Sequence, residues 1–185
     1  YISYILPGKY ENYVSDTKAT ALLTNNSLII DRKDKTLIRV ENPVLSLIDI
    51  IHMFHPIKQN CKGIHPKAVI AENVKIGENV EIAPYAVIEE GVKIGDSVRI
   101  GPGSFISTNS KIGIGTIISS NVSIYHDVII GNNCIIDAGT VIGADGYGLI
   151  SENNTHYQIP HIGSVSIGNN VWIGSNCSID RGSLS

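Results

Sequence analysis

Aromatic residues are scarce in this sequence. Only 6% of its 185 residues are aromatic, with two Phe and one Trp, whereas the chain contains 33 Ile. A core that lacks large rings must be built from β-branched aliphatic side chains, and these favour strands over helices. Because 43% of the residues are hydrophobic, the chain has enough apolar surface to bury a core, which excludes extended disorder.

The sequence also lacks an excess of positive charge and any long apolar run. The net charge is −3 and the pI is near 6.1, which excludes the basic surface that a nucleic-acid backbone requires. The most apolar run, residues 44–54, is interrupted by Ser46, Asp49 and His52. It is therefore too short and too polar to span a membrane.

Cysteine is rare, and its pattern excludes two classes of site. The three Cys are an odd number without disulfide or zinc spacing. The sequence begins Tyr-Ile-Ser-Tyr, with neither Met nor the apolar core of a signal peptide. We therefore expect a cytoplasmic protein without a bound metal, and a chain that does not start at its natural beginning.

Isoleucine recurs at intervals of six residues. The repeat runs without a break from Ile64 to Ile142 and resumes, one residue out of phase, at Ile167, Ile173 and Ile179. The residue two before each Ile is small or β-branched in every hexad except the first, where it is Lys62. The residue after the Ile is often Gly, and we expect these glycines to take a positive φ at a corner.

The period of six distinguishes a strand from a helix. On an α-helix six residues turn 600°, so the Ile side chains would scatter over three faces. On a strand six is an even number, so every Ile points to the same side. A chain that turns a corner every six residues closes after three corners, which predicts a triangular coil of about eighteen residues with rungs about 4.7–4.9 Å apart.

Two segments lie outside this repeat. Residues 1–57 predict a small α/β domain with strands at 19–24, 27–31 and 36–40. A helix follows, with Asn42 as N-cap, Pro43 in the first turn, an end at Pro56 and a core-facing apolar side; that side holds Val44, Leu47, Ile48, Ile51 and Phe54 or His55. Residues 143–160 interrupt the coil and, being rich in Gly and Asn, predict a protruding loop.

The hexad pattern resembles that of the hexapeptide-repeat acyltransferases, whose fold is a left-handed parallel β-helix. One family is similar in detail, the UDP-3-O-(3-hydroxyacyl)glucosamine N-acyltransferases of lipid A biosynthesis. The similar residues are Ile124-Tyr125-His126, the tract from Val141 to Gly148, Ile159-Pro160 with Ile162-Gly163, and Ile179-Asp180-Arg181-Gly182. The resemblance implies a uridine-binding domain at residues 1–57 and a left-handed β-helix at 58–185.

The resemblance also implies a reaction and its partners. The family transfers a 3-hydroxyacyl chain from the phosphopantetheine thioester of acyl carrier protein to the 2-amino group of a UDP-3-O-acylglucosamine. No cofactor stays bound, and the enzymes are typically homotrimers with active sites between adjacent prisms. We therefore expect an N-acyltransferase that works as a homotrimer with acyl carrier protein.

The uridine pocket of the family is matched in part. Its members carry Phe-x-x-Asn-Pro-Lys-Tyr, in which two rings sandwich uracil and the Asn hydrogen-bonds it. The corresponding stretch here is Tyr4-Ile5-Leu6-Pro7-Gly8-Lys9-Tyr10. The resemblance assigns uracil stacking to Tyr4 and Tyr10, while Pro7 replaces the Asn and removes its amide. Alternatively, both rings only cover the core of the small domain.

The catalytic base of the family is not matched. The reaction needs a general base for the amine and a donor for the thioester oxyanion. In the family the base is a His of an Ala-His-Asn turn downstream of Ile-Asp-Arg-Gly, so the resemblance places it beyond Ser185. His126 occupies the same hexad position, two residues after Ile124, and is the candidate base within this chain, with a role in lining the groove as the alternative.

Three other interpretations remain open. The chain by itself is inactive if the base is missing, and would then act as a trimeric scaffold that binds a sugar nucleotide. An acetyl-CoA-dependent sugar acetyltransferase would have the same prism, although residues 4–10 and 143–160 argue against it. A zinc-dependent carbonic anhydrase needs three converging His, and beyond the first coil the regular repeat offers only His126.

Overall fold

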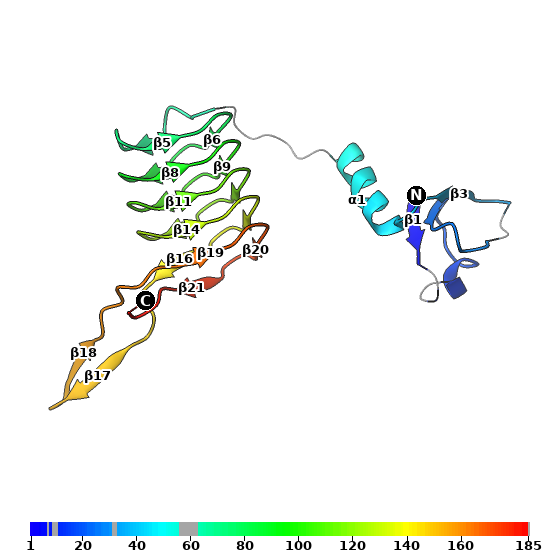
Figure 1. Ribbon diagram of the computed structural model, residues 1–185. Helices are drawn as coiled ribbons and strands as arrows, with labels where there is room; N and C mark the ends of the chain where they lie inside the picture. Colours follow the sequence, from blue (N-terminus) through cyan, green and yellow to red (C-terminus); the bar gives the residue numbers. More distant parts are fainter. Residues whose placement is uncertain (7, 9–10, 31–32, 56–62, 185) are drawn as a thin grey trace. The chain divides into compact units, whose positions relative to one another are not determined.

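The computed structural model describes residues 1–6, 8, 11–30, 33–55 and 63–184. Its contacts divide the chain into two compact units, Tyr1–Lys58 and Gln59–Ser185 (Figure 1). We describe each unit by itself. No helix within the described ranges has the length and apolarity of a membrane span.

The second unit is a triangular coil of very short parallel strands. In the described residues, three sheets of six, five and five strands form its faces (Figure 1). The first face holds β4 (Val69–Ile70), β7 (Val87–Ile88), β10 (Phe105–Ile106), β13 (Ser123–Ile124), β16 (Val141–Ala144) and β21 (Ser178–Asp180). The second holds β5 (Lys75–Ile76), β8 (Lys93–Ile94), β11 (Lys111–Ile112), β14 (Ile129–Ile130) and β19 (Ser166–Ile167). The third holds β6 (Glu81–Ile82), β9 (Arg99–Ile100), β12 (Ile117–Ile118), β15 (Ile135–Ile136) and β20 (Trp172–Ile173).

The repeated Ile fills the centre of the prism, as the period of six predicts. On the first face Ile106 pairs with Ile88 on one side and with Ile124 on the other, which is a step of eighteen residues. These side chains are at most 1% exposed. Burying each one stabilises the fold by about 1.5–3 kcal/mol, so the predicted parallel β-helix is confirmed.

Positive φ occurs at the third residue after the Ile, whereas the sequence led us to expect it at the first. The corner residues concerned are mostly Asn or Gly, and Tyr85, with a φ of 63°, is the bulky exception. Of the described glycines that follow an Ile of the hexad repeat, only Gly143 has a positive φ. Gly101 is needed for a different reason, because a Cβ there would lie 2.6 Å from the carbonyl carbon of Ser119 in the next coil.

Four inward positions carry hydroxyl side chains, and each hydroxyl is satisfied. Ser104 donates to the carbonyl of Ser119 and Ser110 to that of Tyr125, both at 2.8 Å. Thr116 and Thr140 make the same kind of bond with carbonyls of the following coil. These bonds remove the penalty of a buried polar group, so the hydroxyls also tie each coil to the next.

The interruption of the repeat forms a β-hairpin that projects from the prism (Figure 1). Its strands are β17 (Leu149–Glu152) and β18 (Thr155–Gln158), joined by Asn153 and Asn154, both in the left-handed region. An Asn pair at positive φ suits a two-residue hairpin turn. The coil then resumes in register, with Ile142 opposite Ile179.

The first unit is a small parallel sheet with one helix. Its strands are β1 (Ile2–Ile5), β2 (Ala21–Thr24) and β3 (Thr36–Arg39), in that order, with a short 3-10 helix η1 (Glu11–Tyr13) after β1. The strands expected at 19–24 and 36–40 are present with slightly shorter bounds. The strand expected at 27–31 is wrong: residues 27–30 form a turn and a loop, because the Asn25 side chain accepts from Ser27 Oγ and Leu28 N at 2.9 and 3.1 Å.

The helix of the first unit starts as predicted but buries a different side. Asn42 caps α1 (Pro43–Phe54), accepting from the backbone N–H of Val44 and Leu45. Packing of the predicted apolar side into the core is wrong, since Ile48 is 44% and Phe54 74% exposed. The helix contacts β1 and β2 and buries Pro43 fully. Pro56, the predicted stop, lies outside the described residues.

Candidate functional site

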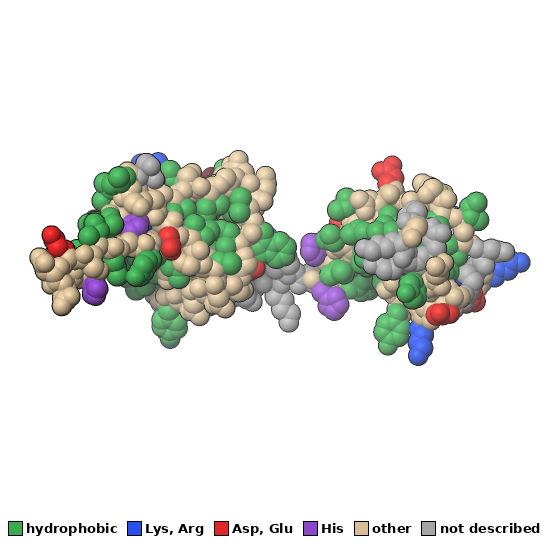
Figure 2. Space-filling model, turned by 90° about the horizontal axis from the view of Figure 1, so that it is seen from below, with side chains coloured by type: hydrophobic (Ala, Val, Ile, Leu, Met, Phe, Trp, Pro, Cys, Tyr) green, Lys and Arg blue, Asp and Glu red, His purple; other side chains and the backbone are tan. Residues whose placement is uncertain are grey.

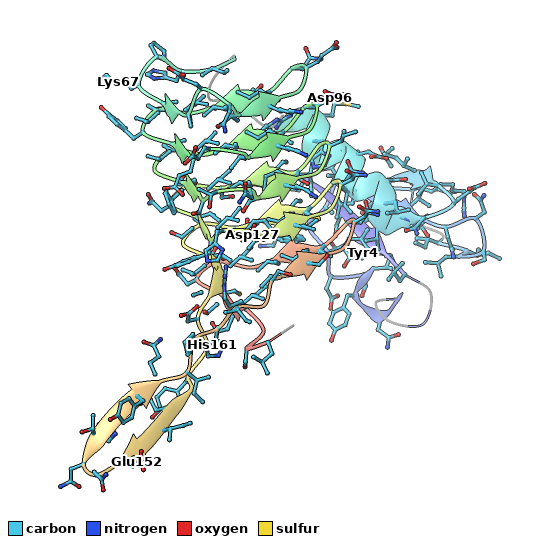
Figure 3. All side chains as sticks on the ribbon, turned by 60° about the vertical axis from the view of Figure 1, so that its left-hand side comes forward. Tyr4, Lys67, Asp96, Asp127, Glu152 and His161 are labelled. Atoms are coloured by element: carbon cyan, nitrogen blue, oxygen red, sulfur yellow. The ribbon has the colours of Figure 1, made fainter. Side chains whose placement is uncertain are left out.

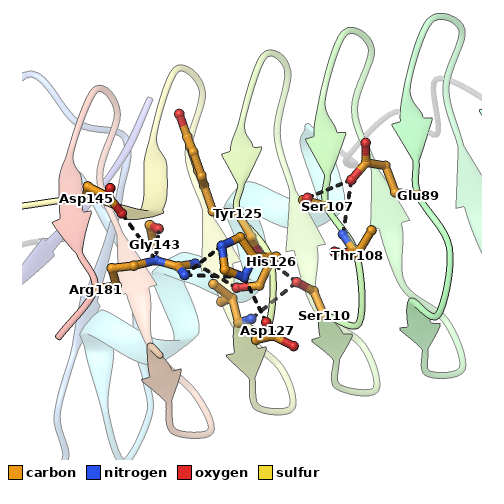
Figure 4. A network of polar contacts seen from close by, with 11 residues as sticks. Glu89, Ser107, Thr108, Ser110, Tyr125, His126, Asp127, Gly143, Asp145 and Arg181 are labelled. Atoms are coloured by element: carbon orange, nitrogen blue, oxygen red, sulfur yellow. Dashed lines mark hydrogen bonds and ion pairs between the residues drawn. The ribbon is translucent and has the colours of Figure 1, made fainter. Parts of the chain in front are cut away.

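A column of polar side chains follows the first face of the prism, at the corner where each strand ends. The strands of this face are paired in register up to their Ile, and between β16 and β21 the register then shifts, so that Ala144 lies opposite Asp180. Two residues after the Ile stand the polar residues Thr108, His126 and Arg181, which Figure 4 labels, and in the coil between the last two this position is Ala144. The hairpin leaves the prism from this same corner, directly after β16.

Arg181 is the centre of this column. Its side chain is 1% exposed. The guanidinium donates from Nε to the carbonyl of Gly143 at 2.7 Å and from Nη2 to the carbonyl of His126 at 2.8 Å. Asp145 lies at the edge of ion-pair range, with Oδ1 4.0 Å from Nε (Figure 4). A buried charge requires such partners, so Arg181 ties the end of the chain to the base of the hairpin.

His126 is held by hydrogen bonds at both ring nitrogens. Nη1 of Arg181 donates to its Nε2 at 2.8 Å, and its Nδ1 lies 2.8 Å from Oδ2 of Asp127. Nη1 of Arg181 also lies 3.3 Å from Nδ1, so one guanidinium nitrogen contacts both ring nitrogens. The candidate base faces the outside, half-exposed as expected, with its ring in contact with Arg181 and Asp127.

A second polar contact lies two coils away on the same corner. Oε2 of Glu89 accepts from the hydroxyl of Ser107 at 2.6 Å and from the backbone N–H of Thr108 at 3.2 Å. Glu89 and Thr108 border an open cleft of about 640 Å³ together with Asn73 and Val87. Within the described residues, no three His, Cys, Asp or Glu side chains come together in a way that would hold a metal ion.

Tyr4 lines a cavity of about 230 Å³ in the first unit. Tyr13 and Thr17 lie on the same cavity, whose floor includes Leu22. Tyr10, the second ring assigned to uracil, and Pro7 lie outside the described residues. Tyr13 was not singled out from the sequence, although it is a third tyrosine within ten residues of Tyr4. The volume is below the roughly 300–1,000 Å³ of pockets that enclose a whole ligand, and it suits a single ring.

The sequence also left Arg181 without a role. The motif Ile-Asp-Arg-Gly was recognised, but the guanidinium meets His126 only after the hairpin has been inserted and the coil has resumed. The signal that was available is chemical: an Arg two residues after a regular inward Ile must be either fully exposed or multiply bonded. The buried Arg181 is of the second kind.

The repeats of this chain match a known family model. The family model described as bacterial transferase hexapeptide (six repeats) matches residues 63–90, 73–108 and 109–144. The coil shows the fold of the second unit, a left-handed parallel β-helix, and its repeats are similar to those of the bacterial hexapeptide transferases, as the resemblance implied.

Individual relatives indicate a narrower family than the repeats do. The chain is 42% identical over 164 residues to the UDP-3-O-acylglucosamine N-acyltransferase of Marinomonas sp. (strain MWYL1), a match that covers 89% of this chain and 48% of the relative. The enzyme of the same name from Pseudomonas syringae pv. tomato is 37% identical over 164 residues, a match that covers 89% of this chain and 46% of that relative. The resemblance to this N-acyltransferase family is thereby confirmed.

The match covers only part of each relative. The chain spans about half the length of the curated relatives it matches. Among solved structures, a perosamine N-acetyltransferase from Caulobacter crescentus is similar with a TM-score of 0.44 and 15% identity, over 86% of this chain and 68% of that one.

Proposed function

We propose that this chain takes part in the transfer of a 3-hydroxyacyl chain from acyl carrier protein to the 2-amino group of a UDP-3-O-acylglucosamine, a step of lipid A biosynthesis. The observation that carries the proposal is the 42% identity to an enzyme named for this acceptor. The 164 matched residues exceed the length of the second unit, so the similarity extends into the first unit as well.

The first unit is proposed to bind the uridine. Tyr4 lines the 230 Å³ cavity of that unit, and Tyr10 is assigned to the opposite side of the base by resemblance. Stacking on an aromatic ring contributes roughly 0.5–1.5 kcal/mol beyond the buried area. Pro7 cannot supply the amide of the family's Asn, so the edge of uracil must be read by a backbone group or by another side chain. Ser3, which borders the same cavity, offers a hydroxyl.

The transfer replaces the thioester of the donor with an amide. The amine lone pair forms the N–C bond to the thioester carbonyl, the C–S bond breaks, and the phosphopantetheine thiol leaves while a base removes the proton from nitrogen. The Ala-His-Asn turn that supplies this base in the family is not present in the 185 residues. Since both ring nitrogens of His126 already have partners, we propose that His126 positions Arg181 and that the chain alone does not catalyse transfer.

The assembly and the compartment follow from the same proposal. A homotrimer would cover apolar side chains that the coil leaves outside, such as Trp172, which is 73% exposed, and Ile129, which is 41% exposed. Acyl carrier protein delivers the acyl thioester, and no cofactor stays bound. The free thiols of Cys134 and Cys177 suit the reducing cytoplasm.

The test is an acylation assay of the natural protein that carries this chain. We expect an amide product from UDP-3-O-acylglucosamine with 3-hydroxyacyl-acyl carrier protein as donor and no product with acetyl-CoA. The reverse preference would establish a sugar acetyltransferase instead. Binding of the UDP sugar without transfer from either donor would make the protein a non-catalytic sugar-nucleotide scaffold.

A further inference from the structure

The second face of the prism carries a column of lysines on its outer side. The tripeptide Lys-Ile-Gly begins β5, β8 and β11, one coil apart each time. These strands pair in register, so Lys93 lies opposite Lys75 on one side and opposite Lys111 on the other. All three side chains are exposed. We call these three residues the lysine column; in the next coil Ile129 takes the same position.

The fold does not require lysine at this position. On the third face Glu81 lies opposite Arg99, and their side chains form an ion pair of 3.8 Å. On the first face Val69 lies opposite Val87. Like charges directly opposite each other destabilise a pair of strands, whereas opposite charges stabilise it. The lysine column therefore carries a repulsion that the corresponding residues of the other two faces avoid.

Protection of a sheet edge does not explain the column either. Lysine side chains commonly protect exposed edge strands from pairing with another chain, and β5 is the edge strand of its sheet. Lys93 and Lys111, however, lie on β8 and β11, which have a neighbouring strand on each side. Two of the three lysines thus have no edge to protect.

The ammonium groups of the column have no partner in the part of the chain that the structure describes. They form neither an ion pair nor a hydrogen bond there. Acidic side chains stand at the corners three residues before and after Lys75 and Lys93, and in the described residues none of them pairs with the column: Glu72, Glu78, Glu90 and Asp96. Asp96 instead accepts from the backbone N–H of Glu78 at 2.8 Å and so ties two coils together (Figure 3).

A groove runs along the column. Its volume is about 440 Å³, and the three Lys-Ile-Gly segments line it together with Ile130. The glycines cannot be replaced by larger residues, because a Cβ on Gly95 would lie 2.9 Å from the backbone N of Ile114 in the next coil. The row beside the lysines is therefore bare backbone, which leaves room for the side chains of a partner.

The spacing of the charges selects the kind of partner. Neighbouring strands lie about 4.7–4.9 Å apart, so the column spans about 9–10 Å. On an α-helix, residues three or four apart are neighbours at about 5–6 Å, and residues i and i+7 are about 10.5 Å apart along the axis. On an extended strand, residues of one side repeat every 6.4–6.8 Å or so, which is roughly 13 Å over two steps. An α-helix matches the column, whereas a strand does not.

We propose that the lysine column is a docking surface for an acidic α-helix of a partner protein. The helix lies along the prism axis, and carboxylates at its positions i, i+4 and i+7 pair with Lys75, Lys93 and Lys111. A nucleic acid fits less well, because the chain has a net charge of −3 and the column supplies only three cations. The inference does not depend on the proposed function.

The experiment measures the fluorescence anisotropy of a labelled, alanine-rich peptide of about 18 residues, long enough to form a helix, as the 185-residue chain is added. The peptide carries Glu at positions i, i+4 and i+7. We expect saturable binding at about 0.1 M ionic strength and its loss at about 1 M, where the Debye length falls to about 3 Å. A peptide of the same composition, with its Glu residues distributed around the helix, should bind at least tenfold more weakly.

Charge reversal in the column should abolish this preference. Lys93→Glu is expected to weaken binding of the first peptide at least tenfold, and Lys75→Glu is a second variant with the same expectation. Lys67→Glu is the matched control, because it makes the same change of net charge at a different corner of the prism (Figure 3), and it should bind as the wild type does. Circular dichroism establishes that each variant is folded.

Four results would overturn the proposal. The first is equal binding of the two peptides, and the second is an equal loss in Lys67→Glu and Lys93→Glu. The third is binding of phosphatidylserine vesicles or of a DNA duplex in place of the peptide, which would assign the column to another class of partner. The fourth is a wild-type chain that ignores the peptide while Lys93→Glu changes its molar mass in light scattering, which would assign the column to a contact between copies of this chain.

Discussion

Arg181 and His126 are 55 residues apart in the chain, and Nη1 of Arg181 donates to Nε2 of His126 at 2.8 Å. The same guanidinium holds the carbonyls of Gly143 and His126. One buried side chain thus fixes the place where the regular coil stops, the hairpin begins and the coil resumes. The corner that carries the candidate residues depends on this contact.

Removing that guanidinium should be costly. Arg181→Ala leaves the carbonyls of Gly143 and His126 without the donors that the guanidinium supplies, and bonds to a charged group are each worth roughly 1.5–3 kcal/mol. We expect a loss of at least about 2 kcal/mol in the free energy of unfolding, measured by urea denaturation. Arg99→Ala is the control, because its contact with Glu81 is 3.8 Å long and partly exposed, and should cost below about 1 kcal/mol. Equal losses in the two variants would contradict the role given to Arg181.

The inward column predicts opposite effects at two adjacent residues. Ile94 is 4% exposed, whereas Lys93 on the same strand points outward and is exposed. Ile94→Asp puts a carboxylate into the apolar centre of the prism and should prevent folding, as judged by circular dichroism and a cooperative melt. Lys93→Asp should fold normally. A cooperatively melting Ile94→Asp variant would refute the placement of the Ile column.

Two glycines in equivalent hexad positions should respond differently to alanine. A Cβ on Gly101 would meet the backbone of the next coil at 2.6 Å, while a Cβ on Gly168 has no atom within 4 Å among the described residues. Gly101→Ala should therefore destabilise the fold by roughly 1–3 kcal/mol, the usual cost of overpacking. Gly168→Ala should be close to neutral in the same melting experiment. Similar losses would mean that backbone freedom, rather than space, explains these glycines.

The corner at Tyr85 should be improvable. Its φ of 63° is unfavourable for a residue with a Cβ, at a cost of about 1–2 kcal/mol. Tyr85→Ala removes the ring and its contact with Lys67, and Tyr85→Gly removes the same groups together with the Cβ. The Gly variant should therefore be more stable than the Ala variant by about 1 kcal/mol. Equal stabilities would show that the corner is not strained.

The β-helix could be predicted from the sequence because its information is local and repeated. Seventeen hexads each carry an Ile at the same inward position, so the pattern is clear even where one hexad departs from it. The role of the Gly after the Ile was wrong, because a collision with the next coil, as at Gly101, leaves no trace in the order of residues. A positive φ and a collision with the next coil both predict glycine at this position, and only the structure distinguishes the two causes.

The first unit was predicted less well because its patterns are short. Residues 27–31 hold a short apolar run typical of a strand, yet Asn25 turns the chain and Nη1 of Arg39 donates to the carbonyl of Leu28 at 2.9 Å. The segment Ile2–Ile5 gives too few residues to reveal β1. Hydrophobic side chains occur around most of α1, so its spacing did not identify the side that packs. Figure 2 shows hydrophobic side chains on the exposed surface.

The candidate site was predictable only in part. The hexad placed His126 on the outside of a corner, and that placement holds. Its partner Arg181 lies beyond the hairpin. Which side chains meet across an insertion depends on where the coil resumes its register, and the one-residue change of phase did not reveal that. Tyr4 stays a proposed uracil contact.

The central claim is that this chain binds a UDP sugar through its first unit. Calorimetric titration of the chain with UDP-glucosamine, UMP and AMP tests it most directly. The account predicts binding of the first two ligands, at least tenfold weaker binding of AMP, and a loss of at least about tenfold in Tyr4→Ala while Tyr157→Ala, on the exposed hairpin, binds as the wild type. A folded wild-type chain that binds none of the three, or binds AMP as well as UMP, would contradict it.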